Sequence, residues 1–221
     1  MHQIAVAERD LERVKPGLPD PPGRVGKGLD DLADPLTIAA CMKHFAAYGA
    51  AQAGRDYHTV DMSERMLRET YLPPFKAALD AGCASVMTSF NELNGVPASG
   101  NPLLLKSILR EEWGFDGMVV TDYTSINEMV EHGFAANVAD AGAQALTAGV
   151  DMDMMSSAYL ENLKQLLADG RVTEEQIDTA VRNVLALKFK LGLFDDPYRY
   201  CDEQREKELH YAESHLKASY E

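Results

Sequence analysis

The sequence predicts an α/β protein built around a parallel β-sheet, and two observations carry this prediction. Four short apolar segments, at residues 38–42, 84–90, 117–121 and 148–154, are separated by segments with the apolar periodicity of helices. Each apolar segment also runs into polar residues. Alternating strands and helices favour βα units and a parallel sheet, so these polar residues are expected to project from one rim.

The first two βα units follow from local signals. The first apolar segment ends at Lys43 and His44, and Ser63 then has the side chain of a helix N-cap. The helix that begins there is expected to bury one apolar stripe, formed by Leu67, Tyr71, Phe75, Ala78 and Leu79. The second apolar segment ends at Asn91, and a second helix is expected over residues 102–112.

The third apolar segment ends on a carboxylate. Residues 118–120 are consecutive β-forming apolar residues, which is typical of a strand buried on both faces, and Asp122 stands where that strand ends. In α/β barrels the carboxyl ends of the strands carry the chemistry, so Asp122 is a catalytic candidate. The strand alone leaves two interpretations open: a catalytic acid, or a cap for the next helix.

The remaining elements are mostly helical. Helical patterns cover residues 125–132, 138–147 and 159–169, and a longer helix is expected from a cap at Thr173 to about Leu191, where Gly192 ends it. The expected apolar face of this long helix consists of Ile177, Ala180, Val181, Val184, Leu185 and Leu187. A charged helical stretch closes the chain, and the start of the chain is rich in proline and glycine, which indicates an irregular lead-in.

Six short motifs carry a family resemblance. They are Lys-His-Phe at 43–45, Gly-Arg-Asp-Tyr at 54–57, Ser-Phe-Asn-Glu-Leu-Asn-Gly at 89–95, Trp-Gly-Phe-Asp-Gly at 113–117, Thr-Asp-Tyr at 121–123 and Ala-Gly-Val-Asp-Met at 148–152. In this order they resemble the β-glucosidases of glycoside hydrolase family 3, over most of the chain.

The resemblance implies a (β/α)8 TIM barrel, of which this chain would hold only the last four βα units. A complete barrel typically needs about 250 residues, whereas this chain has 221. The expected organisation is therefore an irregular lead-in at 1–29, the C-terminal half of the barrel domain at 30–200, and a charged helical connector at 201–221. The other barrel half and a following α/β sandwich domain would be the missing partners.

The same resemblance implies a retaining hydrolysis in which Asp122 is the nucleophile and Lys43 and His44 hydrogen-bond the sugar being cleaved. Retaining glycosidases place two carboxyl groups roughly 5–5.5 Å apart, one to attack the anomeric carbon and one to protonate the leaving oxygen. A nearby cation such as Lys43 favours the ionised form of the nucleophile. The expected substrate is a β-linked oligosaccharide or glucoside.

Four further substrate-binding candidates are less specific. Arg55 and Asp56 follow a Gly/Ala-rich loop and either line the sugar site or form a structural ion pair. Asn91, like Asn94, either contacts substrate or holds its loop through bonds to the backbone. Tyr123 stands where many relatives carry Trp, and an aromatic ring there can stack against a sugar.

One motif leaves an alternative open. Asp56-Tyr57-His58 resembles the loop that supplies the proton donor in bacterial β-N-acetylglucosaminidases, which makes His58 a possible acid/base. That branch usually has Pro-Gly-His-Gly after Lys-His-Phe, whereas this chain has Ala-Ala-Tyr-Gly at 46–49. A second alternative is a carbohydrate-binding fragment without catalysis.

Composition narrows the partner classes. A net charge of −14 and a pI of about 4.8 argue against nucleic acid and anionic membranes as partners. The sequence has no transmembrane run and no signal-type apolar segment near its start, which leaves the compartment of the parent protein open between the cytoplasm and export. No residue spacing suggests a metal site or a cofactor, and buried thiols are expected at Cys41 and Cys83.

Overall fold

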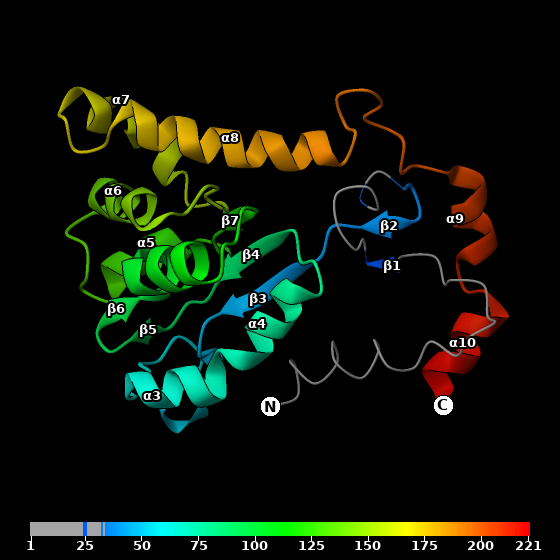
Figure 1. The fold of residues 1–221 in the computed structure, drawn as a ribbon, viewed down its shortest axis with the longest axis horizontal. Helices are drawn as coiled ribbons and strands as arrows, with labels where there is room; N and C mark the ends of the chain where they lie inside the picture. Colours follow the sequence, from blue (N-terminus) through cyan, green and yellow to red (C-terminus); the bar gives the residue numbers. More distant parts are fainter. Residues whose placement is uncertain (1–23, 26–31, 33) are drawn as a thin grey trace.

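The computed structural model describes residues 24–25, 32 and 34–221. At its centre is a parallel sheet of three strands in the order β3 (Cys41–Phe45), β4 (Ser85–Thr88) and β7 (Met118–Val120), as Figure 1 shows. The register pairs Cys41 with Ser85 and Ser85 with Met118. This sheet and its helical connections confirm the α/β class.

The first strand begins later than the sequence predicts. Residues 37–38 form β2 (Thr37–Ile38), which pairs with β1 (Arg24–Val25) in a separate two-stranded sheet. The strand of the central sheet runs over residues 41–45, so Lys43 and His44 lie within β3 rather than after it. The predicted bounds of 38–42 were wrong because β3 remains paired with β4 up to Phe45, across a register shift after Met42.

The fourth apolar segment lies beside β7 but is not a regular strand. Its bridge to the sheet is a single parallel pair between Val120 and Met152. The backbone N–H of Val119 donates to the Asp151 carboxylate at 2.8 Å, whereas Asp151 and Met152 both donate to the carbonyl of Val119. A side chain thus takes the hydrogen bond that a backbone carbonyl would accept in a regular ladder, which corrects the prediction of a strand over 148–154.

Helices connect and cover the strands. The helical elements between β3 and β7 are η1 (Tyr48–Ala50), η2 (Gln52–Gly54), α3 (Glu64–Met66), η3 (Leu67–Tyr71), α4 (Pro73–Asp80), η4 (Ala98–Gly100) and η5 (Leu103–Glu112). A small hairpin of β5 (Glu92–Leu93) and β6 (Val96–Pro97) follows β4. Those after β7 are α5 (Ser125–Glu131), α6 (Val138–Ala148), α7 (Ala158–Ala168), α8 (Glu174–Lys190), α9 (Glu203–Leu209) and α10 (Glu213–Tyr220).

The predicted helix starts are confirmed at two caps. The hydroxyl of Ser63 accepts a hydrogen bond from the N–H of Met66, and Thr173 forms a reciprocal capping box with Gln176. The helix after Ser63 is divided at Leu72, because the prolines that begin α4 lack the N–H groups needed to continue the preceding turns.

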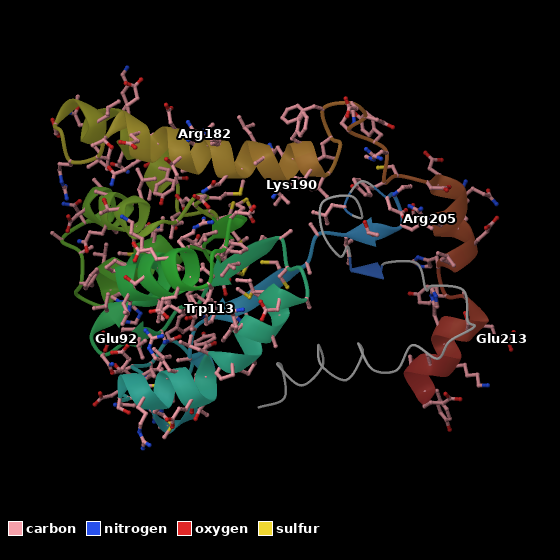
Figure 2. All side chains as sticks on the ribbon, viewed as in Figure 1. Glu92, Trp113, Arg182, Lys190, Arg205 and Glu213 are labelled. Atoms are coloured by element: carbon pink, nitrogen blue, oxygen red, sulfur yellow. The ribbon has the colours of Figure 1, made fainter. Side chains whose placement is uncertain are left out.

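The main core lies between the sheet and the helices that cover it. Its largest fully buried side chains are Phe45, Val60, Leu67, Val86, Leu104, Leu105, Ile108, Leu109, Val119, Ile126, Met129 and Val150. The ring of Phe45 contacts Phe75 and Trp113 edge-on, at centroid distances of 5.2 and 5.9 Å. Trp113 therefore packs against the core, and Figure 2 shows it among densely packed side chains.

Helix α8 departs from its prediction. Ala180 is buried, but Val181 and Leu185 are 49% and 45% exposed, and Phe189 is 73% exposed. These three side chains line a groove with Phe194 on the outside of the helix, so only part of the predicted apolar face packs inward. Helices α9 and α10 bury no residue, and Figure 1 shows them apart from the sheet.

Two expectations concern the ends of the chain. The lead-in expected at 1–29 lies outside the described residues, apart from the two residues of β1. Residues 201–221 are largely helical, as expected, through α9 and α10. Within the described residues, no helix has the length and apolar character needed to cross a membrane.

Candidate active site

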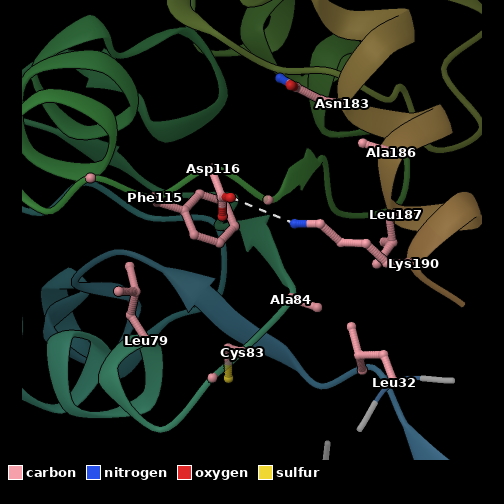
Figure 3. Close-up of a pocket in the computed structure, with 13 residues that line it drawn as sticks. Leu32, Leu79, Cys83, Ala84, Phe115, Asp116, Asn183, Ala186, Leu187 and Lys190 are labelled. Atoms are coloured by element: carbon pink, nitrogen blue, oxygen red, sulfur yellow. Dashed lines mark ion pairs between the residues drawn. The ribbon is translucent and has the colours of Figure 1, made fainter. Parts of the chain in front are cut away.

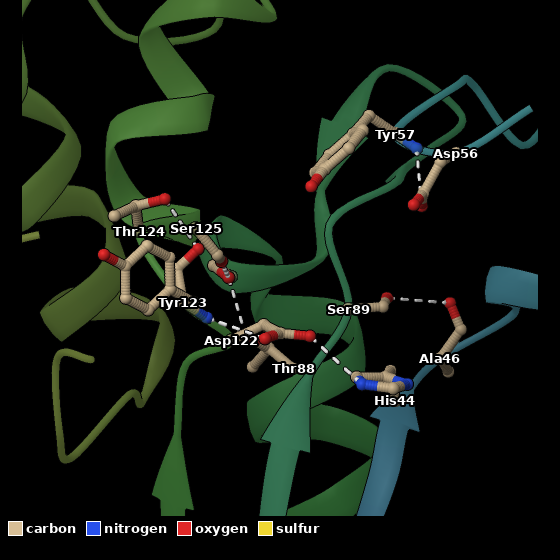
Figure 4. Close-up of polar contacts among 11 residues, drawn as sticks. His44, Ala46, Asp56, Tyr57, Thr88, Ser89, Asp122, Tyr123, Thr124 and Ser125 are labelled. Atoms are coloured by element: carbon tan, nitrogen blue, oxygen red, sulfur yellow. Dashed lines mark hydrogen bonds and ion pairs between the residues drawn. The ribbon is translucent and has the colours of Figure 1, made fainter. Parts of the chain in front are cut away.

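The structure brings His44 and Asp122 together at the carboxyl end of the sheet. His44 lies in β3 and Asp122 comes two residues after β7, with β4 between these strands. His44 Nε2 is 3.1 Å from Asp122 Oδ2, and the two side chains are 17% and 16% exposed. Figure 4 shows this contact across the strand ends. The topology therefore places the two predicted residues side by side, at a point where solvent still reaches both.

The second carboxylate oxygen of Asp122 is held by the adjacent backbone. Oδ1 accepts a hydrogen bond from the N–H of Tyr123 at 2.7 Å. Helix α5 begins at Ser125 with Thr124 as its N-cap residue, and no side chain accepts a capping bond there. The interpretation of Asp122 as a helix cap was therefore wrong. Its carboxylate is directed toward His44, which leaves lone pairs of both oxygens available to a ligand.

The surroundings of His44 favour the neutral form of its imidazole. Burial lowers the pKa of His44 below its ordinary value of 6.5, and the positive charge of Lys43 lowers it further, while Asp122 and Asp56 act in the opposite direction. Because an ionised carboxylate only accepts hydrogen bonds, the neutral ring carries its proton on Nε2 and donates it to Asp122. His44 is thus a directional donor at the edge of the site.

Lys43 is exposed on β3. Within the described part of the chain it forms no ion pair and no side-chain hydrogen bond, yet its charge acts on His44. Its ammonium group therefore keeps all three donors for a ligand. This arrangement matches the sugar-binding role expected of Lys43 without testing it.

Arg55 and Asp56 lie on the loop after η2. Together with Tyr48, Gly49, Ala51 and Gly54 they line a hollow of about 340 Å³. Asp56 Oδ1 accepts the N–H of Tyr57 at 3.1 Å, and neither Arg55 nor Asp56 forms an ion pair with another described residue. The described residues therefore give no support to the alternative that Arg55 or Asp56 forms a structural ion pair. Their charged groups remain exposed beside the site, and the substrate-binding role stays a prediction.

Asn91 has the loop-holding contacts that the sequence left open. It is fully buried, and its Nδ2 donates to the carbonyls of Ala46 and Glu92 at 3.4 and 3.2 Å. Its Oδ1 has no hydrogen-bond partner among the described residues. Asn94 likewise bonds both backbone groups of Met62, at 2.9 and 2.8 Å. A direct substrate contact by Asn91 stays a prediction, since this structure gives it no exposed surface.

Aromatic rings surround the approach to His44, and the sequence did not single out all of them. Tyr57 lies 4.6 Å from Phe90, Tyr48 lies 6.2 Å from Phe90, and Tyr48 meets His44 edge-on at 5.7 Å. Tyr123 is 56% exposed. The signal for Tyr48 and Tyr57 was their position in the Gly/Ala-rich loop after β3, but only the folded loop shows that they face Phe90.

His58 is not brought to the pair. It is exposed, its N–H donates to the carbonyl of Arg55 at 3.4 Å, and its ring has no contact with Asp122 or His44 among the contacts of the described residues. The acid/base role therefore gains no geometric support here. No group of three or more potential metal-ligating side chains occurs among the described residues.

The other Asp residues near the sheet have structural roles. Asp153 accepts the N–H groups of Ser156 and Tyr159 before and within the first turn of α7. Asp151 is buried in a cluster with Arg110 and Asn183. A separate cavity of about 210 Å³ lies at the amino ends of β4 and β7, and Figure 3 shows Cys83, Phe115 and Lys190 in its wall. None of the predicted site residues lines that cavity.

Comparison with known proteins agrees with the ordered motifs and the parallel sheet. A family model described as the glycosyl hydrolase family 3 N-terminal domain matches residues 23–187. The chain belongs to glycoside hydrolase family 3. That N-terminal domain has a TIM-barrel-like fold, to which the α/β arrangement of this member corresponds.

Several relatives of this family 3 chain are named as β-glucosidases or β-xylosidases. A periplasmic β-glucosidase of Salmonella typhimurium is 48% identical over 168 residues, which make up 76% of this chain and 22% of that protein. A putative β-xylosidase of Formosa agariphila is 38% identical over 174 residues, 76% of this chain and 23% of that protein. The crystal structure of a Listeria innocua β-glucosidase with glucose matches with a TM-score of 0.81 and 45% identity, over 86% of this chain and 26% of that chain. This chain therefore spans about a quarter of the length of these relatives.

Proposed function

We propose that this chain is the part of a retaining β-glycosidase that carries the nucleophile, and that its parent removes terminal non-reducing β-D-glucosyl residues. The observation that carries the proposal is the contact of Asp122 with His44 at the carboxyl end of a parallel sheet. A carboxylate held at a strand end, partly exposed and not consumed by a cap, has the properties a nucleophile needs.

The proposed reaction has two displacements. An oxygen of Asp122 attacks the anomeric carbon as the bond to the leaving oxygen breaks, which gives a covalent glycosyl-enzyme intermediate. Water then attacks the same carbon, and the carboxylate leaves. His44 and Lys43 bind hydroxyls of the sugar, and hydroxyl contacts of this kind strengthen toward the transition state.

The proton for the leaving group needs a second acid. No other carboxylate contacts Asp122 among the described residues, and His58 has no contact with the pair. We propose that the acid/base belongs to another part of the parent enzyme. The β-N-acetylglucosaminidase alternative would need His58 close to the anomeric centre, and no observation favours it.

The glucosyl preference rests on the relatives. The Salmonella typhimurium and Listeria innocua proteins, at 48% and 45% identity, are named β-glucosidases, whereas the Formosa agariphila β-xylosidase is 38% identical. A mutant of the Listeria innocua enzyme was also solved with laminaribiose. Xylosyl and other related β-glycosyl residues are the second substrate class.

The proposed organisation follows the expectation from the sequence. Residues 30–200 would form the C-terminal half of a barrel domain, with residues 201–221 as a connector to a further domain. The parallel order β3-β4-β7, followed by the segment bridged to β7, supports this assignment. The remaining strands and the acid/base would then come from other parts of the parent enzyme.

The decisive experiment places residues 34–190 in the matching segment of the Listeria innocua β-glucosidase. Incubation with a 2-deoxy-2-fluoro-β-glucosyl fluoride, followed by peptide mapping, is expected to find the label on Asp122. Asp122→Asn in this chimera is expected to abolish turnover of an aryl β-glucoside with little change in folding. Asp116→Asn, at a carboxylate that is 88% exposed, is the matched control and is expected to keep activity.

Two results would contradict the proposal. Ordinary activity of the Asp122→Asn chimera would remove the nucleophile assignment. A folded chimera that binds the aryl glucoside but neither turns it over nor takes up the label would favour the non-catalytic carbohydrate-binding alternative.

A further inference from the structure

Three buried hydroxyl groups form a chain behind the His44–Asp122 pair. Thr88 Oγ1 and Ser99 Oγ are 2.7 Å apart, and Ser99 Oγ also bonds Ser125 Oγ. Thr88 ends β4, Ser99 lies in η4, and Ser125 is the first residue of α5. Their exposures of 0%, 1% and 3% exclude solvent as a partner. No step of the proposed reaction uses these groups.

The two ends of this hydroxyl chain reach the two halves of the site. Thr88 pairs in register with Phe45, the residue directly after His44. At the other end, the N–H of Ser125 donates to the backbone carbonyl of Asp122 at 3.2 Å. Figure 4 shows Thr88 and Ser125 around the strand end that carries Asp122. The hydroxyl chain therefore runs from the strand of His44, across the central strand, to the loop of Asp122.

Because the three hydroxyl groups are buried, their hydrogen bonds fix the positions of Thr88, Ser99 and Ser125 relative to one another. The elements that carry them are lined with buried apolar residues of the main core, such as Val86 in β4 and Ile126 and Met129 in α5. In such a place, a hydroxyl that loses its partner is left buried and unsatisfied, which is costly, so the three groups are held at bonding distance. Ser99 is central because both bonds pass through it. Apolar side chains of the same volume would fill the space but would fix no direction.

We propose that Thr88, Ser99 and Ser125 are positioning residues that set the approach of Asp122 to His44. This inference rests on the proposed function for its catalytic meaning, but its geometry is testable without any turnover. A misplacement of a reacting group by about 1 Å can lower a rate by roughly 100-fold, so a lateral tie between the two strand ends would protect the reaction.

The pKa of the His44 imidazole depends directly on how close Asp122 lies to it. The charged groups that face His44 are Asp122 and Asp56, which raise its pKa, and Lys43, which lowers it. Moving Asp122 away must therefore lower the pKa of His44. The measurement is an NMR titration of the His44 ring in the 221-residue chain, with Asp122→Asn as the reference for complete loss of the carboxylate charge.

Thr88 offers a matched pair of variants. Thr88→Val keeps the shape and removes the hydroxyl, whereas Thr88→Ser keeps the hydroxyl and removes a methyl group. We expect Thr88→Val and Ser99→Ala to lower the pKa of His44 by roughly half or more of the shift given by Asp122→Asn. Thr88→Ser is expected to leave it unchanged, although the lost methyl group lowers the melting temperature.

Several outcomes would overturn the inference. If Thr88→Ser shifts His44 as much as Thr88→Val, the residue acts through packing. If Asp122→Asn shifts His44 and the hydroxyl variants do not, the chain does not position the pair; if Asp122→Asn itself has no effect, there is no pair to position. Circular dichroism identifies the variants that fold. If Ser99→Ala does not fold, the comparison of Thr88→Val with Thr88→Ser decides the question. The labelling of Asp122 in the chimera is a separate result, so failure of the proposed function would be recognised independently.

Discussion

Replacing Asp151 with alanine is expected to cost about 3–4 kcal/mol of unfolding free energy, because its carboxylate connects three elements. Its side chain is 5% exposed. Oδ2 accepts hydrogen bonds from Arg110 Nη2 and from the N–H of Val119, and Oδ1 accepts one from Asn183 Nδ2, all at 2.8 Å. Truncation leaves a buried N–H without a partner and a guanidinium without its counter-ion.

The magnitude lies toward the lower part of the range for broken buried pairs, roughly 3–5 kcal/mol. Arg110 is 21% exposed and keeps its hydrogen bonds to the carbonyls of Phe115 and Gly117. Burial also raises the pKa of Asp151 despite its donors, so the ionised carboxylate is itself costly to bury. The loss therefore comes mainly from the partners that remain unsatisfied.

Urea unfolding measures this loss, with the fluorescence of Trp113, the single tryptophan, as the probe of the core. The melting temperature should fall by roughly 6–16 °C. Asp116→Ala is the control, because Asp116 is 88% exposed and its Oδ2 lies 3.6 Å from Lys190 Nζ. Figure 3 shows this ion pair at the surface cavity. That surface pair should contribute less than about 1 kcal/mol. A loss for Asp151→Ala no larger than that of Asp116→Ala would refute the reasoning.

Four further predictions concern the site and the outer surface. In the chimera, Lys43→Ala and His44→Ala are expected to lower kcat more than they raise KM for an aryl β-glucoside; unchanged kinetics for both would remove them from the site. The pKa of His44 is lower in the folded state than its ordinary value of 6.5. Below pH 6.5 the unfolded state therefore binds more protons than the folded state, so stability should be lost as the pH falls from 6.5 through the folded-state pKa. His44→Gln should reduce this loss when melting temperatures are compared at about pH 5 and pH 8, and an unchanged difference would contradict the prediction. The 221-residue chain alone should leave cellobiose uncleaved, and brisk cleavage detected by glucose release would bring His58 forward as the acid. We expect the exposed apolar groove on α8 to make the chain self-associate, so Phe189→Glu, at a side chain 73% exposed, should reduce self-association in analytical ultracentrifugation; unchanged self-association would contradict this.

The parts of the fold that the sequence predicted are those with local causes. A buried strand such as β7 needs only consecutive apolar residues, and the caps at Ser63 and Thr173 depend on bonds within one turn. The position of β3 depends instead on where β4 stops pairing with it, which a single segment does not encode. The prediction of a strand at residues 148–154 was wrong for a related reason: the side chain of Asp151, instead of a backbone carbonyl, accepts the hydrogen bond from Val119.

The site was predictable to the extent that it follows from topology. Polar residues at the ends of neighbouring parallel strands must share a rim, so the approach of His44 to Asp122 could be expected. Burial of Asn91 and the ring contacts of Tyr48 and Tyr57 could not, because they depend on how the loops after β3 and β4 fold against each other. The hydroxyl chain is also a tertiary feature, with members at positions 88, 99 and 125.

Two aspartates beside the same strand show how structure and function separate in this chain. Asp151 supports the strand, and every oxygen of its side chain is engaged by donors from other elements. Asp122 follows the strand, where one backbone N–H and one imidazole engage its carboxylate and part of its surface remains open. A fully satisfied carboxylate stabilises the fold, because any change of partner costs energy. A carboxylate that accepts only one bond at each oxygen, as Asp122 does, has spare capacity and can exchange a protein contact for a bond to substrate. That difference in satisfaction, rather than residue type or strand, is why we propose Asp122 and not Asp151 as the nucleophile.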